Sequence, residues 1–306
     1  MIKKILLICV ALLFLTACGK SEGVDYDYRQ GHEGLTIDFS DNSFSSYIYE
    51  GNVFYLNLVI ENEGATDVEG ARIVLSTERD LIEDFENVKN LDLLGRTKFF
   101  DQGELKNVPF ELTTKKIPVT EEIESKIRVD ICYPYRSLLS TSVCIESDTI
   151  NKYEDVPKGC PAKPLSFNAG QGAPIVITDV ITKMMPSKNG GVPVFEITVE
   201  DFGSGTVLNK ENYEQACSGQ QYGRENYGVV DVGNIYLGND KLECTKSVLK
   251  LEKLQRGNEF YETNRAVIKC TGQEIAPREP YIENLRVDLT YGYKDYREDY
   301  LTIVKK

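Results

Sequence analysis

The sequence predicts an all-β protein built from two antiparallel immunoglobulin-like β-sandwich modules in tandem. Short apolar stretches that alternate with polar residues recur along the chain, turn-forming residues separate them, and helical periodicity is almost absent. The chain also lacks the strand–helix–strand alternation that is typical of a parallel sheet. Its 306 residues are enough for two domains that each bury a core.

Residues 1–17 have the pattern of a signal peptide. Lys3 and Lys4 precede an apolar run over 5–15, which is shorter than the roughly 20 residues of a membrane-spanning helix. The run ends in Leu-Thr-Ala-Cys, which resembles the lipobox of prokaryotic lipoproteins. That resemblance implies cleavage before Cys18 and a lipid on Cys18 that holds the protein at the extracytoplasmic face of the cell membrane. An uncleaved hydrophobic anchor with an incidental cysteine is the alternative.

The rest of the chain divides into a tether, two modules and a linker. Residues 18–34 are polar and contain glycine, which is typical of a flexible tether. The first module is expected over 35–156 and the second over 175–306. Between them, residues 157–174 have the proline and glycine content of a linker.

Apolar alternation places the strands of the first module. Residues 56–60 and 68–75 are two strands joined by the turn sequence Glu-Asn-Glu-Gly. Further strands are predicted at 35–39, 97–100, 110–114, 126–133 and 142–147. Only residues 78–89 have a helical pattern, and it is weak.

The second module repeats part of the first. Residues 195–203 align without a gap on residues 56–64, and Val207 falls at the position of Val68. Chance similarity between two alternating strands is the alternative, but a duplicated module accounts for more of the shared features. The remaining strands are predicted at 229–237, 247–252, 266–270, 284–291 and 300–304, with a short helix at 209–217.

Residues 54–75, with the sequence FYLNLVIENEGATDVEGARIVL, resemble the early strands of CARDB-type domains. These are immunoglobulin-like modules of prokaryotic surface proteins, named for cell adhesion. The resemblance extends over about residues 35–115 and more faintly over 174–210. It implies surface display with a role in adhesion or spacing, and it brings no catalytic residues. The cysteine-rich remainder departs from the family pattern.

Six cysteines remain after Cys9, which lies in the signal peptide, and Cys18. An even number in an exported chain favours disulfides, and the tight Cys-x-x-Cys pairs of zinc or redox sites are absent. We predict a bridge between Cys132 and Cys144 that closes a hairpin with its loop at 133–143. The other predicted bridges are Cys244–Cys270 and Cys160–Cys217. Six cysteines allow 15 pairings, so other connectivities stay open. A reactive thiol pair is the functional alternative.

Two groups of tyrosines are candidate contacts for a protein or cell-surface partner. Tyrosine suits interfaces because it combines a broad apolar area with a polar tip. It also suits strands, so packing is the alternative, and we weigh it above binding. The candidates are Tyr133 and Tyr135 in the predicted loop, and Tyr291, Tyr293, Tyr296 and Tyr300 on the predicted closing hairpin.

The charge of the chain excludes nucleic-acid binding. The formal net charge is −13, and removal of Lys3 and Lys4 with the signal peptide takes it to −15. Such a surface repels phosphate backbones and anionic headgroups, because both require a high density of lysine and arginine.

The sequence contains no recognisable catalytic, metal-binding or cofactor motif. The only histidine, His32, lies in the predicted tether, which cannot hold it beside a nucleophile or a zinc ion. Acidic residues gather at 121–124 and 295–299 without the spacing of a calcium loop. We therefore expect a non-catalytic adhesion, display or scaffold protein without a cofactor. The alternative is a solute-binding or carboxylate-dependent hydrolytic lipoprotein, which a pocket between the modules lined by tyrosines and carboxylates would favour.

Overall fold

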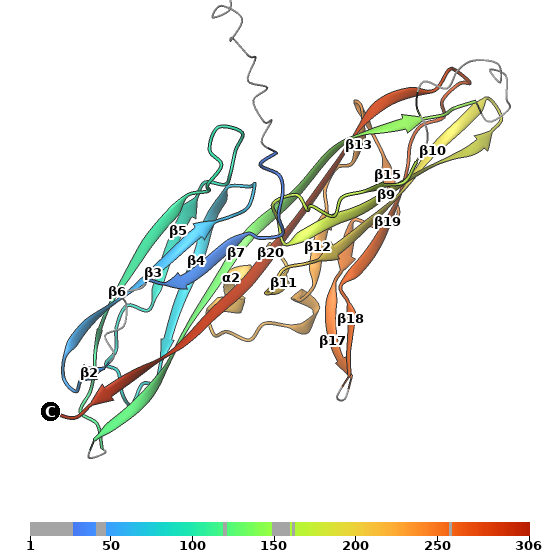
Figure 1. Cartoon of the computed structure of the whole chain (residues 1–306). Coiled ribbons are helices and arrows are strands. Elements are labelled where there is room, and N and C mark those ends of the chain that lie inside the picture. Colours follow the sequence, from blue (N-terminus) through green and yellow to red (C-terminus); the bar gives the residue numbers. More distant parts are fainter. Residues whose placement is uncertain (1–26, 41–46, 119–120, 149–159, 161–162, 257–258) are drawn as a thin grey trace, which may run out of the picture.

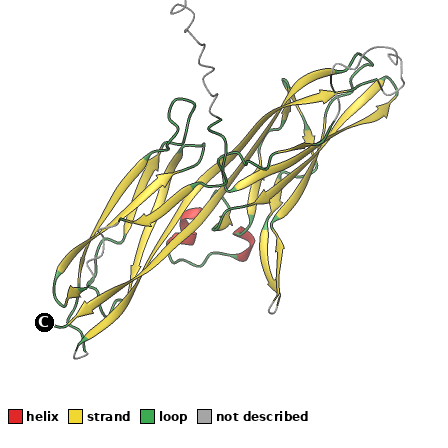
Figure 2. Cartoon of the chain, viewed as in Figure 1, coloured by secondary structure: helices red, strands yellow, loops and turns green. Residues whose placement is uncertain are grey.

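The computed structural model describes residues 27–40, 47–118, 121–148, 160, 163–256 and 259–306. The predicted signal peptide and Cys18 lie outside these residues. Strands form nearly all of the regular structure (Figure 2). The only helices in the described ranges are α2 (Tyr213–Cys217) and the short 3-10 helix η2 (Arg224–Asn226). The all-β prediction is therefore confirmed.

Two strands of 24 residues form the framework of the molecule. They are β7 (Glu122–Ile145) and β20 (Tyr281–Val304), and they pair antiparallel along their whole length. Figure 1 shows them crossing the molecule from one lobe to the other. At about 3.4 Å per residue, this ladder is about 80 Å long. Every second residue of β7 from Ser125 to Leu139 is buried, as are Val143 and Ile145, so one face of the strand covers the core.

The two long strands lie at the centre of a ten-stranded sheet. On one side, β7 pairs with β4 (Val68–Thr77), which pairs with β5 (Val88–Leu93). On the other side, β20 pairs with short strands and with a parallel strand near its end. These are β11 (Thr206–Leu208), β12 (Val229–Val232), β13 (Tyr236–Leu237) and the parallel β2 (Ile48–Tyr49). Two further strands extend this side, β14 (Asp240–Lys241) on β13 and β16 (Val248–Lys250) on β12.

Two smaller sheets and one hairpin complete the fold. The first sheet has the order β1 (Leu35–Phe39), β3 (Val53–Asn62), β6 (Leu105–Thr113). The second has the order β15 (Glu243–Cys244), β19 (Arg265–Thr271), β10 (Gly190–Asp201), β9 (Ile175–Ser187), β8 (Leu165–Ser166). The hairpin consists of β17 (Glu252–Arg256) and β18 (Glu259–Thr263).

One apolar core connects the smaller sheets to the long strands. The alternate residues of β3 that face inward, such as Leu58, are fully buried, and so is Ile197 of β10. Both belong to the same cluster as Val129 of β7 and Leu289 of β20. Burial of these side chains, each contributing about 1.5–3 kcal/mol, holds the smaller sheets against the shared sheet.

The repeat predicted from the sequence has a counterpart in the structure. At the end of β3, the side-chain oxygen of Asn62 accepts a hydrogen bond from the Gly64 amide at 3.1 Å. At the end of β10, Asp201 accepts the equivalent bond from the Gly203 amide, also at 3.1 Å. β3 lies between β1 and β6 in its sheet, and β10 lies between β19 and β9 in its own. Residues 56–64 and 195–203 thus share strand position and turn geometry.

Two predicted hairpins are wrong. Residues 133–143 are the middle of β7 rather than a loop, and β20 continues through the predicted break between 291 and 300. Pro134 and Gly292 lie near the start of the two predicted loops, and both are unfavourable in a central strand, because proline rarely occurs there and glycine weakens one. In the structure these two residues lie opposite each other, and the ladder continues on both sides of them.

The predicted boundaries also differ from the structure. β7 belongs to the predicted first module and β20 to the second, yet they are neighbours in one sheet. Within the predicted linker 157–174, Leu165–Ser166 forms β8 and Ala173 is fully buried. The two halves therefore share a sheet and a core instead of being joined only by a linker.

Two smaller predictions are also corrected. Residues 78–89 contain no helix, and Ile82 forms an isolated bridge to Thr114 instead. The predicted strand at 97–100 is a tight turn closed by a bridge between Thr97 and Phe100. The predicted helix at 209–217 is confirmed over its last part as α2.

Candidate functional site

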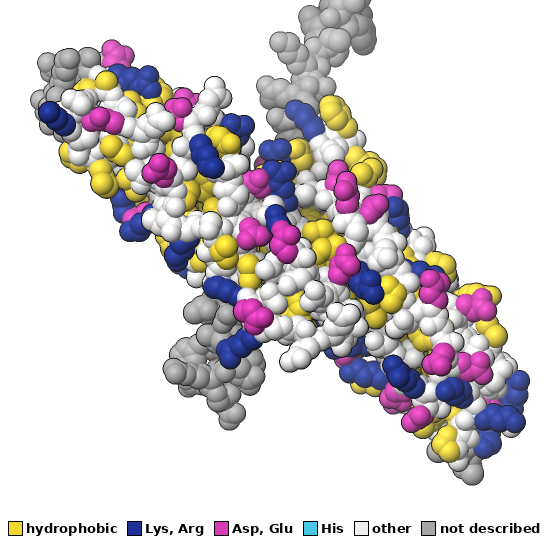
Figure 3. Space-filling model, turned by 180° about the vertical axis from the view of Figure 1, so that it is seen from behind, with side chains coloured by type: hydrophobic (Ala, Val, Ile, Leu, Met, Phe, Trp, Pro, Cys, Tyr) yellow, Lys and Arg dark blue, Asp and Glu magenta, His cyan; other side chains and the backbone are white. Residues whose placement is uncertain are grey.

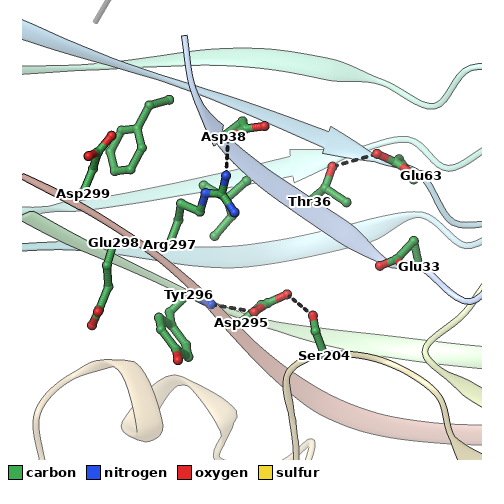
Figure 4. Close-up of a pocket in the computed structure, with 12 residues that line it drawn as sticks. Glu33, Thr36, Asp38, Glu63, Ser204, Asp295, Tyr296, Arg297, Glu298 and Asp299 are labelled. Carbon is green, nitrogen blue, oxygen red and sulfur yellow. Dashed lines mark hydrogen bonds and ion pairs between the residues drawn. The ribbon is translucent and has the colours of Figure 1, made fainter. Parts of the chain in front are cut away.

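A groove of about 890 Å³ lies between β1 and the middle of β20 (Figure 4). The β1 strand carries Thr36 and Asp38 along one side, and β20 carries Asp295 to Asp299 along the other. The remaining lining residues come from the start of the described chain and from two turns. The complete lining is Glu33, Thr36, Ile37, Asp38, Phe39, Glu63, Ser204, Asp295, Tyr296, Arg297, Glu298 and Asp299.

Short polar contacts position several carboxylates around the groove. Thr36 donates a hydrogen bond to Glu63 at 3.2 Å, and Ser204 donates one to Asp295 at 3.1 Å (Figure 4). Arg297 reaches across from β20 to Asp38, with 3.4 Å between nitrogen and oxygen. This ion pair is exposed, and such pairs contribute little to stability. The contacts therefore orient the lining more than they stabilise the fold.

The groove carries an excess of negative charge. Six of its lining residues are acidic, and Arg297 is its single basic one among those described. Burial raises the pKa of Glu33, and the nearby Glu63 and Asp295 raise it further. Such an environment favours a proton or a cation.

A network of ion pairs lies next to the groove and holds Tyr296. Glu298 accepts bonds from Lys126 at 2.7 Å and Arg128 at 2.9 Å, and the hydrogen bond from Lys126 is the main reason that its pKa is lowered. The Arg128 guanidinium also lies 4.1 Å from the centre of the Tyr296 ring. Arginine over an aromatic ring contributes about 0.5–1 kcal/mol at an exposed site.

Arg128 also contacts a buried acid behind this network. Burial alone would raise the pKa of Asp130, but hydrogen bonds from Arg128 and Lys294 outweigh that effect, so the pKa is lowered. Asp130 therefore remains ionised at neutral pH. This fixed charge keeps Arg128 under the Tyr296 ring.

Four of the six predicted contact tyrosines are buried. Tyr133 and Tyr135 on β7 lie beside Tyr291 and Tyr293 on β20, with ring centroids 5.7–6.4 Å apart. We call these four side chains the tyrosine cluster. They are inaccessible to a partner, so the prediction that they make partner contacts is wrong, and the packing alternative is correct for them.

The hydroxyls of the tyrosine cluster bind backbone groups at equivalent places in the two halves. Tyr133 accepts a hydrogen bond from the Leu35 amide at 3.1 Å, where β1 begins. Tyr291 accepts one from the Ile175 amide at 3.3 Å, where β9 begins. Each tyrosine thereby attaches the first strand of its own half to the shared sheet.

Tyr296 and Tyr300 differ from the cluster because both are exposed on β20. Tyr296 lines the groove, whereas Tyr300 lies beyond it. Of the predicted contact residues, only these two remain available to a partner.

The six cysteines form three disulfides: Cys132–Cys217, Cys144–Cys160 and Cys244–Cys270. The predicted Cys244–Cys270 bridge is confirmed, and the predicted Cys132–Cys144 and Cys160–Cys217 bridges are wrong. Cys132 and Cys144 lie on one continuous strand, about 40 Å apart at 3.4 Å per residue, which no disulfide can span. Cys132 instead attaches α2 to β7.

The described part of the predicted tether is packed against the body. Gly31 forms a bridge to Gly170, and the Gly31 amide donates to the Ala169 carbonyl at 2.7 Å. His32 stacks on Phe202 with ring centroids 4.8 Å apart. Gly170 has φ of +75°, and a Cβ there would lie 2.2 Å from the Gly31 oxygen, so the contact requires glycine. A flexible tether over the whole of 18–34 is therefore wrong for its last residues.

The sequence indicates only part of the groove. Asp295, Glu298 and Asp299 form an acidic cluster in the sequence, whereas Glu33, Asp38 and Glu63 are distant from it along the chain. No local pattern places β1 beside the middle of β20. The available signal is the turn sequence at 61–64, which belongs to the repeated segment and contributes Glu63 to the groove.

Within the described ranges, no group of three or more histidine, cysteine or acidic side chains is arranged to hold a metal ion. The same part of the chain has no helix with the length and apolar character needed to cross a bilayer.

Comparisons with known proteins leave the family open. No family model matches the chain, and no curated protein matches it. Among solved structures, the chain is similar to the CupB6 tip adhesin from Pseudomonas aeruginosa, with 9% identity over 90% of this chain and 97% of that one. The TM-score is 0.14, which carries no argument about fold or function.

Proposed function

We propose that the protein is a lipid-anchored, extracytoplasmic surface protein that acts as a non-catalytic adhesion, display or scaffold module. The observation that carries the proposal is the pairing of all six cysteines beyond Cys18 in three disulfides. Disulfides persist in oxidising compartments outside the cytoplasm. The lipobox-like sequence before Cys18 supports the same location, and the resemblance of residues 54–75 to CARDB-type modules supports a role in adhesion or spacing.

The long strand pair suits display. β7 and β20 form a continuous ladder of about 80 Å, so the two ends of the molecule are held apart by a single sheet. Leu35, at the start of β1, contacts the tyrosine cluster near the middle of this ladder. A lipid on Cys18 would thus hold the body by its middle and leave both ends accessible.

Fractionation of cells that express the full chain tests this proposal. We expect the native protein in the membrane fraction, where protease added outside the cytoplasmic membrane degrades it. Cys18→Ser should release the protein or leave the signal peptide attached, because the lipid acceptor is gone. Cys9→Ser is the matched control and should behave like the native protein. A Cys18→Ser variant processed and retained like the native protein, or a native protein that the protease cannot reach, contradicts the proposal.

The acidic groove supports a second candidate function, the binding of a cationic solute or a basic peptide segment. Its volume, its excess of carboxylates and the exposed ring of Tyr296 favour this class. Titration calorimetry with spermidine and with octalysine tests it. We expect binding that Asp38→Asn with Glu63→Gln weakens and that salt screens. Equal heats for the native protein and the double variant rule out this candidate.

A further inference from the structure

Four large apolar side chains are exposed between the end of β5 and the first residue of β6. Over residues 94–105, the exposed fraction is 97% for Phe99, 59% for Leu94, and 49% for both Phe100 and Leu105. Single exposed apolar residues are common on soluble proteins, but clusters mark interaction sites. Phe99 is the most exposed large apolar side chain of the described residues. We call this segment the 94–105 loop.

The loop presents its phenylalanines on a hydrogen-bonded turn. Thr97 and Phe100 exchange two backbone hydrogen bonds, at 2.7 and 3.2 Å. At the base, the Arg96 amide donates to the Gly64 carbonyl at 2.8 Å, and the Gly95 amide donates to Asp67 at 2.8 Å. These bonds keep the phenylalanines exposed, because the turn cannot fold back onto the body without breaking them.

The loop lies beside the start of the described chain. The Arg96 side chain donates to the Gln30 carbonyl at 2.5 Å. Figure 1 shows the loop, in teal, standing out from its lobe on the side where the described chain begins. Cys18 precedes Asp27 by nine residues, which span at most about 30 Å when fully extended. A lipid on Cys18 would therefore hold Asp27 within about that distance of the bilayer, and the loop contacts the chain three residues further on, at Gln30.

The local charge permits approach to a membrane. The 94–105 loop contains Arg96 and Lys98 together with Asp101 and Glu104, so its net charge is zero, whereas the whole chain carries −13. Figure 3 shows acidic and basic side chains interspersed over one face of the body. Hydrophobic side chains lie at the surface near the upper end of the lobe that is on the right in this view. Because it is neutral and aromatic, the 94–105 loop is less strongly repelled by anionic headgroups than the rest of the surface.

The size of the patch favours a bilayer over a folded partner. A phenylalanine buries about 150–250 Å², whereas a stable protein interface needs about 800 Å² on each side. Insertion into the boundary between headgroups and acyl chains requires no matching surface and scales with the apolar area buried.

We propose that Phe99 and Phe100 insert into the membrane that holds the lipid on Cys18, and so form a second, non-covalent membrane contact. This inference rests on the proposed lipid anchor. The contact gives the body a second point of attachment to the membrane besides the lipid on Cys18, and two points of attachment define its orientation better than one. The groove and the two ends of the ladder would then face in defined directions relative to the membrane.

The chain contains no tryptophan, so a single introduced tryptophan reports on one position. Lipidated Phe99→Trp protein is reconstituted into vesicles of phosphatidylethanolamine and phosphatidylglycerol with brominated acyl chains. We expect blue-shifted emission and quenching several-fold stronger than for Tyr55→Trp. Tyr55 is a matched control because it is 58% exposed and lies on β3, seven residues from the Asn62 end that contacts the loop. Phe100→Trp is a second reporter and should be quenched like Phe99→Trp.

The outcomes distinguish the absence of membrane insertion by Phe99 and Phe100 from the absence of a lipid on Cys18. Intact mass of each sample first establishes whether Cys18 carries a lipid. In lipidated protein, quenching of Phe99→Trp no stronger than that of Tyr55→Trp overturns the inference. A blue shift that grows with protein concentration but is insensitive to brominated lipid also overturns it, because the occupant is then a second copy. An unlipidated Cys18 overturns the anchor and this inference together.

Discussion

Tyr133 of β7 lies directly opposite Tyr293 of β20, with ring centroids 5.8 Å apart. The next pair along the ladder on the same face is Tyr135 opposite Tyr291. β7 and β20 thus carry the same Tyr-x-Tyr sequence in antiparallel register, as two copies of one strand would. The tyrosine cluster therefore joins β7 to β20, which belong to the two predicted modules.

Loss of a single hydroxyl from the cluster should destabilise the protein. Tyr133→Phe leaves the buried Leu35 amide without its acceptor, and Tyr291→Phe does the same for Ile175. An unsatisfied buried amide costs about 1–3 kcal/mol. We expect losses of this size, similar for both variants, in denaturant unfolding. Tyr300→Phe is the exposed control and should change stability by less than about 0.5 kcal/mol. Equal stability of all three variants would contradict the structural role of the cluster.

The cluster also predicts a loss of stability at alkaline pH. Burial raises the pKa of Tyr133 and Tyr291 well above the usual value, so both stay protonated in the folded state. Unfolded tyrosine ionises near pH 10, so above that pH the unfolded state binds fewer protons. The stabilisation is complete below about pH 10 and decreases as the pH rises, by about 1.4 kcal/mol per pH unit for each tyrosine.

Unfolding free energies between about pH 8 and pH 11 test the sign and the origin of this effect. Tyr133→Phe should flatten the alkaline decrease, and Tyr300→Phe should leave it less changed. A decrease of equal slope in Tyr133→Phe and in the native protein would show that other groups cause it.

Gly64 should resist substitution because Tyr135 occupies the space of a side chain. A Cβ at Gly64 would lie 1.6 Å from the Tyr135 hydroxyl and 2.7 Å from the Gly172 carbonyl. We expect Gly64→Ala to cost about 1–3 kcal/mol through overpacking. Tyr135→Phe should recover part of this loss in the double variant, since it removes the nearest atom. Strictly additive effects in the double-mutant cycle would exclude the contact.

The disulfides should differ in their contribution to stability. In the chain-entropy model, a bridge contributes more as the loop it closes lengthens. Cys132–Cys217 spans 85 residues and Cys144–Cys160 spans 16. Replacement of each pair by alanine should therefore cost about 4–5 kcal/mol for the first and about 3 kcal/mol for the second. Peptide mapping without reduction checks the connectivity, and a Cys132–Cys144 peptide would contradict the structure.

The sequence predicted well what depends on local patterns. Leu56, Leu58 and Ile60 alternate with polar neighbours because one face of β3 is buried, and that periodicity locates the strand. The repeat was visible for the same reason, since Asn62 and Asp201 each end such a strand beside a glycine.

What the sequence could not predict depends on contacts between distant segments. Pro134 lies opposite Gly292 of β20 and two residues beyond Cys132, where the pairing of β7 with β4 ends, and no local rule reveals these neighbours. The Cys132–Cys217 bridge requires α2 to lie against β7, and the groove requires Asp38 to approach Arg297. Local alternation specifies which residues of a strand face inward but not which strand lies beside it.

Intact-mass analysis of the full-length gene product, extracted from membranes with and without reduction, tests the account most directly. We expect a chain that begins at Cys18 and carries a diacylglyceryl group, with six thiols that can be alkylated only after reduction. A chain that retains Met1 and has free thiols before reduction would contradict both the lipid anchor and the extracytoplasmic location.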